Sequence, residues 1–211
     1  MIIAIDGPSA SGKGTLARRL AAHLGYAHLD SGLLYRAVAA KLLEAGRDPA
    51  DRAAAQAVAE ALRPDDLERS DLRDEAVGRA ASAVAAQPAV RQALLAAQRR
   101  FAERPPGAVV DGRDIGTVVF PDAEVKLFIE ADLETRALRR HKELLERGET
   151  SIYARVQQEM QDRDARDSGR QASPLRRAED ATVIDTSTMD ADAAFAAALR
   201  IVAARSTGRT P

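Results

Sequence analysis

The sequence predicts an α/β fold in which a parallel sheet of five strands is flanked by helices. Short apolar segments, typical of buried strands, recur at residues 2–5, 26–29, 108–110, 125–129 and 182–184. Segments with helical periodicity separate them, as in a doubly wound sheet. A polar residue follows the end of four strands: Asp6, Asp30, Asp111 and Asp185. Because right-handed crossovers bring these ends to one edge of the sheet, we expect a ligand site there.

The first strand leads into a glycine-rich segment with the pattern G-x-x-x-x-G-K. It reads Gly7, Pro8, Ser9, Ala10, Ser11, Gly12, Lys13, Gly14 and Thr15. Glycines let the backbone approach an anion because no Cβ blocks it, and N–H groups at a helix start attract negative charge. Lys13 adds a mobile cation for the β- and γ-phosphates. The segment therefore predicts a nucleoside triphosphate site.

The flanking residues favour a phosphate loop over an incidental glycine-rich turn. The next helix has leucines at 16, 20 and 24 and Gly25 at its end, so strand, loop and helix stand in the required order. The lysine is followed by Gly14 instead of the usual Ser or Thr, and the hydroxyl comes one place later. That hydroxyl, on Thr15, either binds phosphate or contacts a metal ion through water.

The interval between the second and third strands is almost wholly helical. Helices are expected near 33–46 and 51–62, then a charged loop at 63–71, and then two helices divided by Pro88. The interval ends at Pro105-Pro106-Gly107. These helices are too many for one crossover, so part of the interval is expected to form a lobe.

The last third of the chain alternates between helices and charged segments. Helices are expected at 133–145, 152–162 and 191–205, with a frayed tail at 206–211. The alternating charges of residues 163–170 are either a solvated helix face or a mobile flap. We favour the flap because the run ends in Ser168-Gly169 and precedes Pro174.

Composition disfavours several classes of function. The chain has 31 basic and 32 acidic residues, so neither a nucleic-acid surface nor a polybasic membrane anchor is indicated. Cysteine is absent, which removes disulfides, thiolate metal sites and thiol nucleophiles. The first strand begins at Ile2, which leaves no room for a secretory signal, and no apolar run reaches the length of a membrane span. We expect a soluble, cytoplasmic protein.

Further motifs accompany the glycine-rich loop, in order along nearly the whole chain. They are Asp30-Ser31-Gly32 with Tyr35-Arg36, Ala80-Ala81-Ser82, Pro88-x-Val90-Arg91, the segment 111–123, and residues 163–170. With the loop, they resemble the bacterial cytidylate kinases, of the nucleoside monophosphate kinase group of P-loop kinases. The resemblance implies transfer of the γ-phosphoryl group of ATP to CMP or dCMP, with Mg²⁺ as cofactor. The family often inserts a small β-sheet where residues 62–72 are short and strand-poor, which predicts a reduced lobe.

The resemblance also implies a role for each matching residue. ATP would be bound by residues 7–15, Arg136 and Arg140. CMP would be held by Ser31, Arg36, Ser82, Arg91, Arg113, Asp114, Arg163, Asp167 and Arg170. Within this set the acceptor phosphate would be clamped by Arg36, Arg113 and Arg170, and the ribose would lie near Arg163 and Asp167. The catalytic residues would be Lys13, Arg113, Arg163 and Arg170, and Asp111 would approach Mg²⁺ through water.

The implied organisation is a single P-loop kinase domain. Its core would comprise residues 1–32, 105–147 and 171–205, with a monophosphate-binding lobe at about 33–104 and a lid at about 148–170. Closure of lobe and lid would keep water from the γ-phosphate. The expected partners are the small-molecule substrates ATP and CMP or dCMP, without nucleic acid or membrane, and the protein is expected to be a monomer.

The residue types suit this reaction on chemical grounds. The second pKa of a phosphate monoester is about 6, so the acceptor is mostly dianionic at neutral pH and needs no general base. His23, His28 and His141 fall in predicted helices or a strand and are expected to be structural. Positioning and charge neutralisation remain, and Mg²⁺, Lys13 and the arginines would supply them.

Base selection also has a physical rationale. Cytosine offers acceptors at O2 and N3, which suit the fork of Arg91, and an amine donor, which suits Asp114 or Ser82. Uracil reverses the pattern at N3 and position 4 and would leave buried groups unpaired. The alternative is that Arg91 and Asp114 pair with other charges of the protein.

Three other functions are compatible with the loop alone. A kinase for UMP, AMP or a small metabolite such as shikimate is disfavoured by the set Ser82, Arg91 and Asp114. A nucleotide-dependent switch is disfavoured because the chain has no Asn-Lys-x-Asp sequence and has many arginines beyond the loop. The intact Gly12-Lys13 argues against a non-catalytic binding module.

Overall fold

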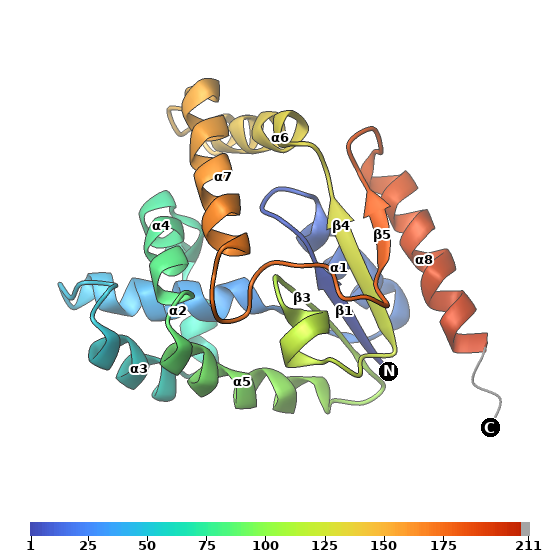
Figure 1. Cartoon of the computed structure of the whole chain (residues 1–211), viewed down its shortest axis with the longest axis horizontal. Coiled ribbons are helices and arrows are strands. Elements are labelled where there is room, and N and C mark those ends of the chain that lie inside the picture. The colour runs from blue at the N-terminus through green and yellow to red at the C-terminus, as the bar shows by residue number, and fades with distance from the viewer. Residues whose placement is uncertain (208–211) are drawn as a thin grey trace. The chain divides into compact units, whose positions relative to one another are not determined.

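The computed structural model describes residues 1–207, and side chains through residue 205. A five-stranded sheet has the order β2-β3-β1-β4-β5, and the paired strands are parallel. The strands are β1 (Ile2–Asp6), β2 (Ala27–Asp30), β3 (Ala108–Gly112), β4 (Val125–Glu130) and β5 (Thr182–Asp185). Helices separate them in the chain (Figure 1). The predicted fold class is confirmed, and each strand ends one or two residues later than expected.

The helices follow the predicted order. They are α1 (Lys13–Leu24), α2 (Ser31–Glu44), α3 (Arg52–Glu60), α4 (Glu75–Val84), α5 (Pro88–Ala102), α6 (Leu133–Glu146), α7 (Tyr153–Ser168) and α8 (Ala191–Thr207). The tail expected at 206–211 lies mostly outside the described residues. Among the described residues, no helix is both long and apolar enough to cross a membrane.

The chain divides into two compact units. The sheet unit comprises Met1–His28 and the chain from Arg104 onward, and the helical unit comprises Leu29–Glu103.

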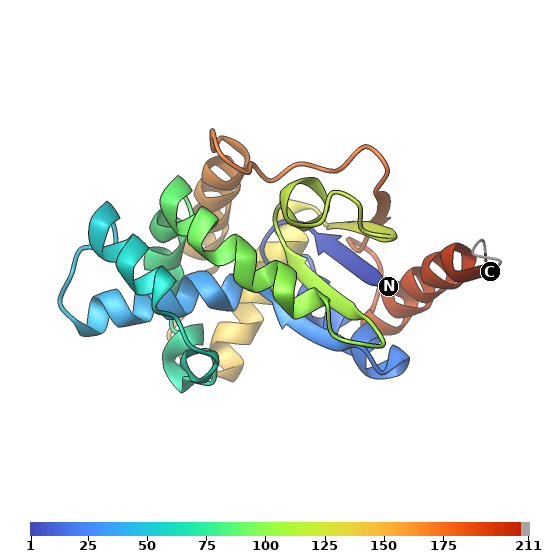
Figure 2. The same cartoon turned by 90° about the horizontal axis from the view of Figure 1, so that it is seen from below.

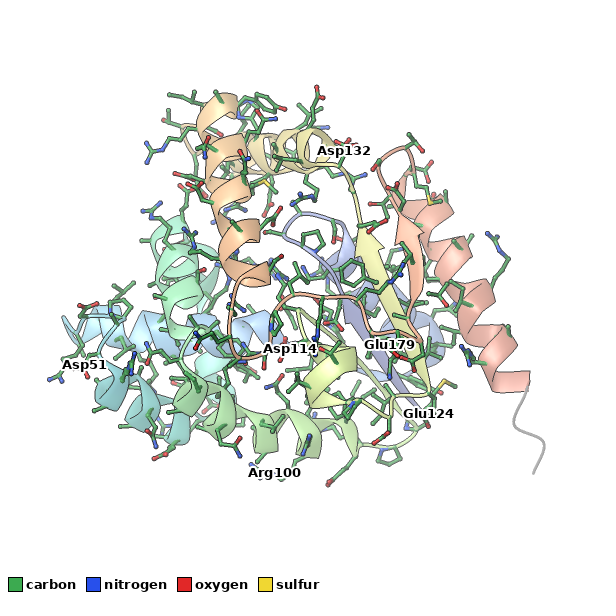
Figure 3. All side chains as sticks on the ribbon, viewed as in Figure 1. Asp51, Arg100, Asp114, Glu124, Asp132 and Glu179 are labelled. Atoms are coloured by element: carbon green, nitrogen blue, oxygen red, sulfur yellow. The ribbon has the colours of Figure 1, made fainter. Side chains whose placement is uncertain are left out.

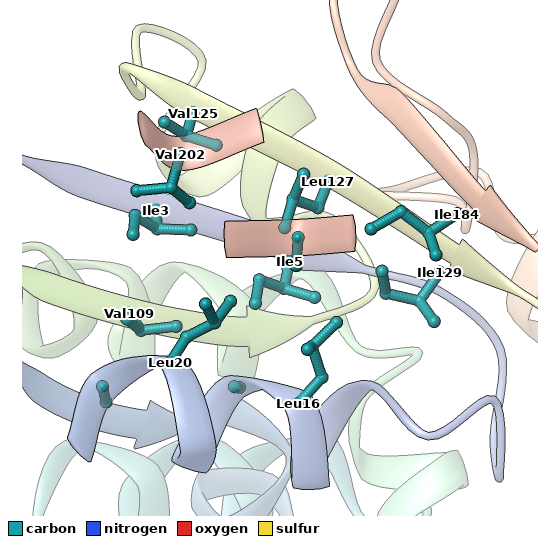
Figure 4. Packing of buried hydrophobic residues seen from close by; sticks show 13 residues of the cluster. Ile3, Ile5, Leu16, Leu20, Val109, Val125, Leu127, Ile129, Ile184 and Val202 are labelled. Atoms are coloured by element: carbon teal, nitrogen blue, oxygen red, sulfur yellow. The ribbon is translucent and has the colours of Figure 1, made fainter. Parts of the chain in front are cut away.

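Alternate residues of the strands form the core of the sheet unit. Successive side chains of a strand point to opposite faces, so Ile3 and Ile5 of β1 share one face, where they join Leu16 and Leu20 of α1 (Figure 4). Helix α8 adds Val202 to the same cluster. Burial of each such side chain contributes about 1.5–3 kcal/mol. This packing holds the end of β1 and the start of α1 in place, and with them the loop that joins the two.

The opposite face of β1 carries a helical turn that the sequence analysis did not anticipate. The π-helical turn η3 (Ile115–Val119) follows β3 and lies beside β1, as both Figures 1 and 2 show. By the same alternation, Asp6 points to this face, and it is only 4% exposed.

Helices α6 and α7 pack against each other around a small second cluster. Its buried members are Ala137, Leu144, Val156 and Met160. The helix expected at 152–162 continues to Ser168. Residues 163–168 are therefore the end of a helix, and the buried Asp167 shows that its inner face is not solvated. The mobile flap at 163–170 stays a prediction.

The core of the helical unit combines alanines with larger buried side chains such as Leu42, Leu72 and Leu94. Helix α2 packs against α3 and α4, and α3 packs against α5. Alanines at 37, 39, 40, 55, 59 and 81 are buried and allow close approach of the helices. The loop expected at 63–71 contains two short 3₁₀ turns, η1 (Pro64–Leu67) and η2 (Ser70–Arg73). Residues 31–103 contain no strand, in keeping with the reduced lobe expected here.

Candidate active site

The glycine-rich loop between β1 and α1 has a backbone that few residues tolerate. Gly7 has φ 153°, and a Cβ there would lie 2.0 Å from the carbonyl oxygen of Ile129. Gly12 has φ 89° and occupies the N-cap of α1 without a side-chain hydrogen bond. The first N–H groups of a helix need acceptors, and a phosphate is well suited to supply them. The loop therefore presents backbone donors where the sequence predicts a triphosphate.

Lys13 lies folded against this loop. Its side-chain nitrogen Nζ donates to the carbonyl oxygen of Pro8 at 3.1 Å, and the residue is 9% exposed. The hydroxyl of Ser11 is buried and has no hydrogen-bond partner among the described residues. Thr15 is exposed, and its hydroxyl accepts from Arg18 at 3.4 Å.

Asp111 lies next to the start of α1. It is 2% exposed, and a Cβ on Gly14 would lie 3.7 Å from its Oδ2 atom. Its Oδ1 atom lies 2.8 Å from Nε2 of His28. The structure thus brings the carboxylate predicted for Mg²⁺ beside the loop, and it adds His28, which sequence reasoning had treated as structural, as its partner.

Two side chains from distant segments support the loop: Arg136, which was expected on the ATP side, and Thr186, which the sequence did not indicate. The Nε of Arg136 donates to the carbonyl oxygen of Ala131 at 2.8 Å and its Nη1 to that of Ser9 at 3.4 Å, while Nη2 pairs with Asp164 of α7 at 2.7 Å. The hydroxyl of Thr186, just after β5, donates to the carbonyl oxygen of Ser11 at 2.9 Å. Arg136 therefore reaches the loop as expected for a donor-site arginine.

Arg140 does not share these contacts. It forms an ion pair with Glu143, one turn further along its own helix, at 3.0 Å.

Asp167 is the centre of an arginine cluster that joins β3 to the end of α7. Its carboxylate accepts from Nε of Arg113 at 3.0 Å, pairs with Arg170, and lies 3.9 Å from Nε of Arg163. Burial at 1% exposure opposes ionisation of Asp167, but Arg113, Arg170 and Arg163 outweigh it and hold its pKa below the ordinary value. Four of the predicted acceptor-site residues are thereby brought together.

Asp114 follows β3 and stands at the N-cap of η3, where Figure 3 labels it. It is 5% exposed and makes no side-chain capping hydrogen bond. The N–H groups of Ile115 and Gly116 donate instead to Asp6, at 2.8 Å to Oδ1 and 2.7 Å to Oδ2. Burial raises the pKa of Asp6 to about 6, although these two hydrogen bonds lower it. The role of Asp6 was not visible from the sequence.

The helical unit contains the remaining residues that were predicted to bind CMP. Arg36 donates to the carbonyl oxygen of Leu72 at 2.7 Å and passes over Gly78, where a Cβ would lie 3.1 Å from its Nη2 atom. Ser82 lies one turn after Gly78 on α4, and its buried hydroxyl has no hydrogen-bond partner among the described residues.

Arg91 and Ser31 complete this group. Arg91 lies 5.3 Å from the ring centre of Tyr35 and donates to the carbonyl oxygen of Ala85 at 3.1 Å. Ser31 is buried at the first position of α2. The neighbour of Arg91 is thus an aromatic ring on α2, and its Nη1 atom donates to a backbone carbonyl.

The fold and the loop define a P-loop nucleotide-binding protein of the α/β class. A family model described as "Cytidylate kinase" matches residues 3–204. The cytidylate kinase of Methylobacterium sp. (strain 4-46) is 62% identical over 209 residues, covering 99% of this chain and 100% of the relative. That of Paramagnetospirillum magneticum is 59% identical over 207 residues, covering 97% and 98%. The chain belongs to the cytidylate kinase family and is a kinase.

A solved structure supports the fold alone. The crystal structure of an uncharacterized protein from Eubacterium ventriosum ATCC 27560 aligns with a TM-score of 0.58 and 16% identity, covering 96% of this chain and 98% of that one.

Proposed function

We propose that the protein transfers the γ-phosphoryl group of ATP to CMP or dCMP, giving ADP and CDP or dCDP in pyrimidine nucleotide metabolism. The observation that carries the proposal is the family match over residues 3–204, together with a phosphate loop whose Lys13 lies in place beside it. The residues expected to hold CMP are Ser31, Arg36, Ser82, Arg91, Arg113, Asp114, Arg163, Asp167 and Arg170.

On the donor side, the backbone of residues 7–15 binds the phosphates of ATP. The N–H groups at the start of α1 act as fixed donors, and Lys13 exchanges its contact with the carbonyl of Pro8 for a phosphate oxygen. Arg136, held near Ser9, adds positive charge on the same side. The contact of Arg140 with Glu143 would have to break for it to join.

Mg²⁺ suits the residues at the start of α1. It prefers oxygen ligands and is commonly held by one or two carboxylates together with substrate phosphates. Asp111, beside Gly14, offers such a carboxylate, and Thr15 offers a hydroxyl. When bound, Mg²⁺ neutralises charge on the transferring group and on the leaving phosphate.

On the acceptor side, arginines offset repulsion between two polyanions. The phosphate of CMP is already mostly dianionic at neutral pH, so the residues position it and remove no proton. Arg36, Arg113 and Arg170 bind that phosphate. A single arginine at the transferring group accelerates such reactions by about 10³- to 10⁵-fold.

Cytosine is recognised by complementary donors and acceptors. Arg91 donates to O2 and N3, and Ser82 and Asp114 accept from the amine. The buried hydroxyl of Ser82 supports this assignment because a buried polar atom that finds no partner in the protein is suited to a ligand. The proposal also includes a monophosphate-binding lobe at about 33–104, a lid at about 148–170, a monomeric state and a cytoplasmic location.

The test is a coupled assay of ADP release with a panel of nucleoside monophosphates. CMP and dCMP should be phosphorylated, and UMP and AMP should be much poorer substrates because the base contacts are then mismatched. Lys13→Met should abolish turnover. The matched control is Lys142→Met, at a side chain that is 77% exposed, and it should retain activity. Absence of CMP turnover by folded wild-type protein would reject the proposal.

A further inference from the structure

The buried carboxylate of Asp6 joins the two segments that serve the two substrates. Asp6 is the last residue of β1 and directly precedes Gly7 of the phosphate loop. Its two oxygens accept from the N–H groups of Ile115 and Gly116, at 2.8 and 2.7 Å. Those residues begin the η3 turn, immediately after Arg113 and Asp114. These contacts span 109 and 110 residues of sequence.

The capping arrangement at η3 is unusual. A helical start needs acceptors for its first N–H groups, and an Asp at the N-cap position commonly supplies one. Asp114 occupies that position but makes no side-chain capping hydrogen bond, and Asp6 supplies both acceptors from another strand. The first N–H groups of this turn are therefore capped by Asp6 and not by Asp114.

We propose that Asp6 is a positioning residue for the acceptor nucleotide: by capping η3 in place of Asp114, it sets where Asp114 presents its carboxylate to the cytosine amine. This inference rests on the proposed function. Its energetic basis is the low exposure of both residues, since buried hydrogen bonds to a charged group are stronger than neutral ones. Burial disfavours the ionised form of Asp6 and raises its pKa to about 6, whereas the two hydrogen bonds from Gly116 and Ile115 favour that form.

The most direct test is the variant Asp6→Asn, whose side chain has the same shape as that of Asp6 but only one oxygen that can accept a hydrogen bond. One N–H of η3 then faces an amide NH₂ group, so the turn and Asp114 should shift. We expect the KM for CMP to rise on the order of 10- to 100-fold, while the KM for ATP changes by less than about twofold. The preference for CMP over UMP should fall.

The matched control is Asp190→Asn. At the start of α8, the Oδ1 atom of Asp190 accepts from the N–H groups of Asp192 and Ala193, at 3.0 and 2.8 Å. Because one oxygen serves both donors there, Asn can replace Asp without loss, and the kinetics should be unchanged.

A double-mutant cycle tests whether Asp6 acts through Asp114. If it does, Asp6→Asn should add little to the loss of base discrimination already caused by Asp114→Asn. Additive effects, or equal changes in the KM values for CMP and ATP, would overturn the inference. So would failure of both Asp6→Asn and Asp6→Ser to fold, because Asp6 would then be needed for stability. An inactive wild-type protein would instead reject the proposed function.

Discussion

Two carboxylates of the sheet unit, Asp6 and Asp167, are both buried away from water, but different partners compensate their charge and their pKa values shift in opposite directions. Asp6 accepts hydrogen bonds from the backbone N–H groups of Ile115 and Gly116, and burial raises its pKa to about 6. Asp167 is still less exposed, yet burial is outweighed by Arg113, Arg170 and Arg163, and its pKa is lowered.

The two carboxylates differ in the kind of partner they have, and this difference suits them to different roles. Backbone donors do not move, so Asp6 is suited to fixing a turn. Arginine side chains rotate and carry full charge, so those around Asp167 are suited to exchanging a carboxylate for a phosphate.

The largest expected effect is the loss of the charge on Asp167. Asp167→Asn leaves neighbouring guanidinium groups without their counter-charge, and breaking a buried pair in this way typically costs about 3–5 kcal/mol. Asp6→Asn leaves one N–H unsatisfied, which costs about 1–3 kcal/mol. Urea unfolding at neutral pH should therefore show the larger loss for Asp167→Asn. The reverse order would mean that the arginines do not depend on Asp167.

Next in size is the pH dependence of stability, which should have opposite signs at the two sites. The folded-state pKa of Asp6, about 6, lies above the unfolded value of 3.8, so the folded protein binds more protons within that window. As the pH falls through 6 towards 3.8, the free energy of unfolding of the wild type should therefore rise by about 3 kcal/mol relative to that of Asp6→Asn.

For Asp167, the folded pKa lies below 3.8, so its contribution is present above that pH and is lost as the pH falls below it. Thermal unfolding of the wild type and each Asn variant across this pH range checks both signs. A wild-type advantage over Asp6→Asn that grows with rising pH would contradict the assignment.

The smallest expected effect is a difference in salt dependence. Arginines that bind the acceptor phosphate act partly through charge, so the wild-type KM for CMP should rise with ionic strength as the Debye length shrinks from about 30 Å at 0.01 M to about 3 Å at 1 M. The ratio of this KM between Asp6→Asn and wild type should stay constant, because Asp6 acts through geometry. A ratio that collapses at high salt would indicate that Asp6 acts through its charge.

Local segments were the predictable part of this molecule. The phosphate loop is contiguous, and its glycines, lysine and flanking elements are visible in nine residues and their neighbours. The five strands were found because apolar runs between helical patterns are a strong signal. The end of α7 was predicted less well because alternating charges conceal that one face of it, at Asp167, is buried.

By itself the sequence determined the fold class, the phosphate loop and the residue types that match the cytidylate kinase family, because each is written in short patterns of neighbouring residues. Only the tertiary structure decided which distant groups meet: Asp6 with the start of η3, Thr186 with Ser11, and Arg136 with both Ser9 and Asp164. Sequence spacing carries no signal for such contacts, since they depend on strand order and on helix ends brought together by core packing.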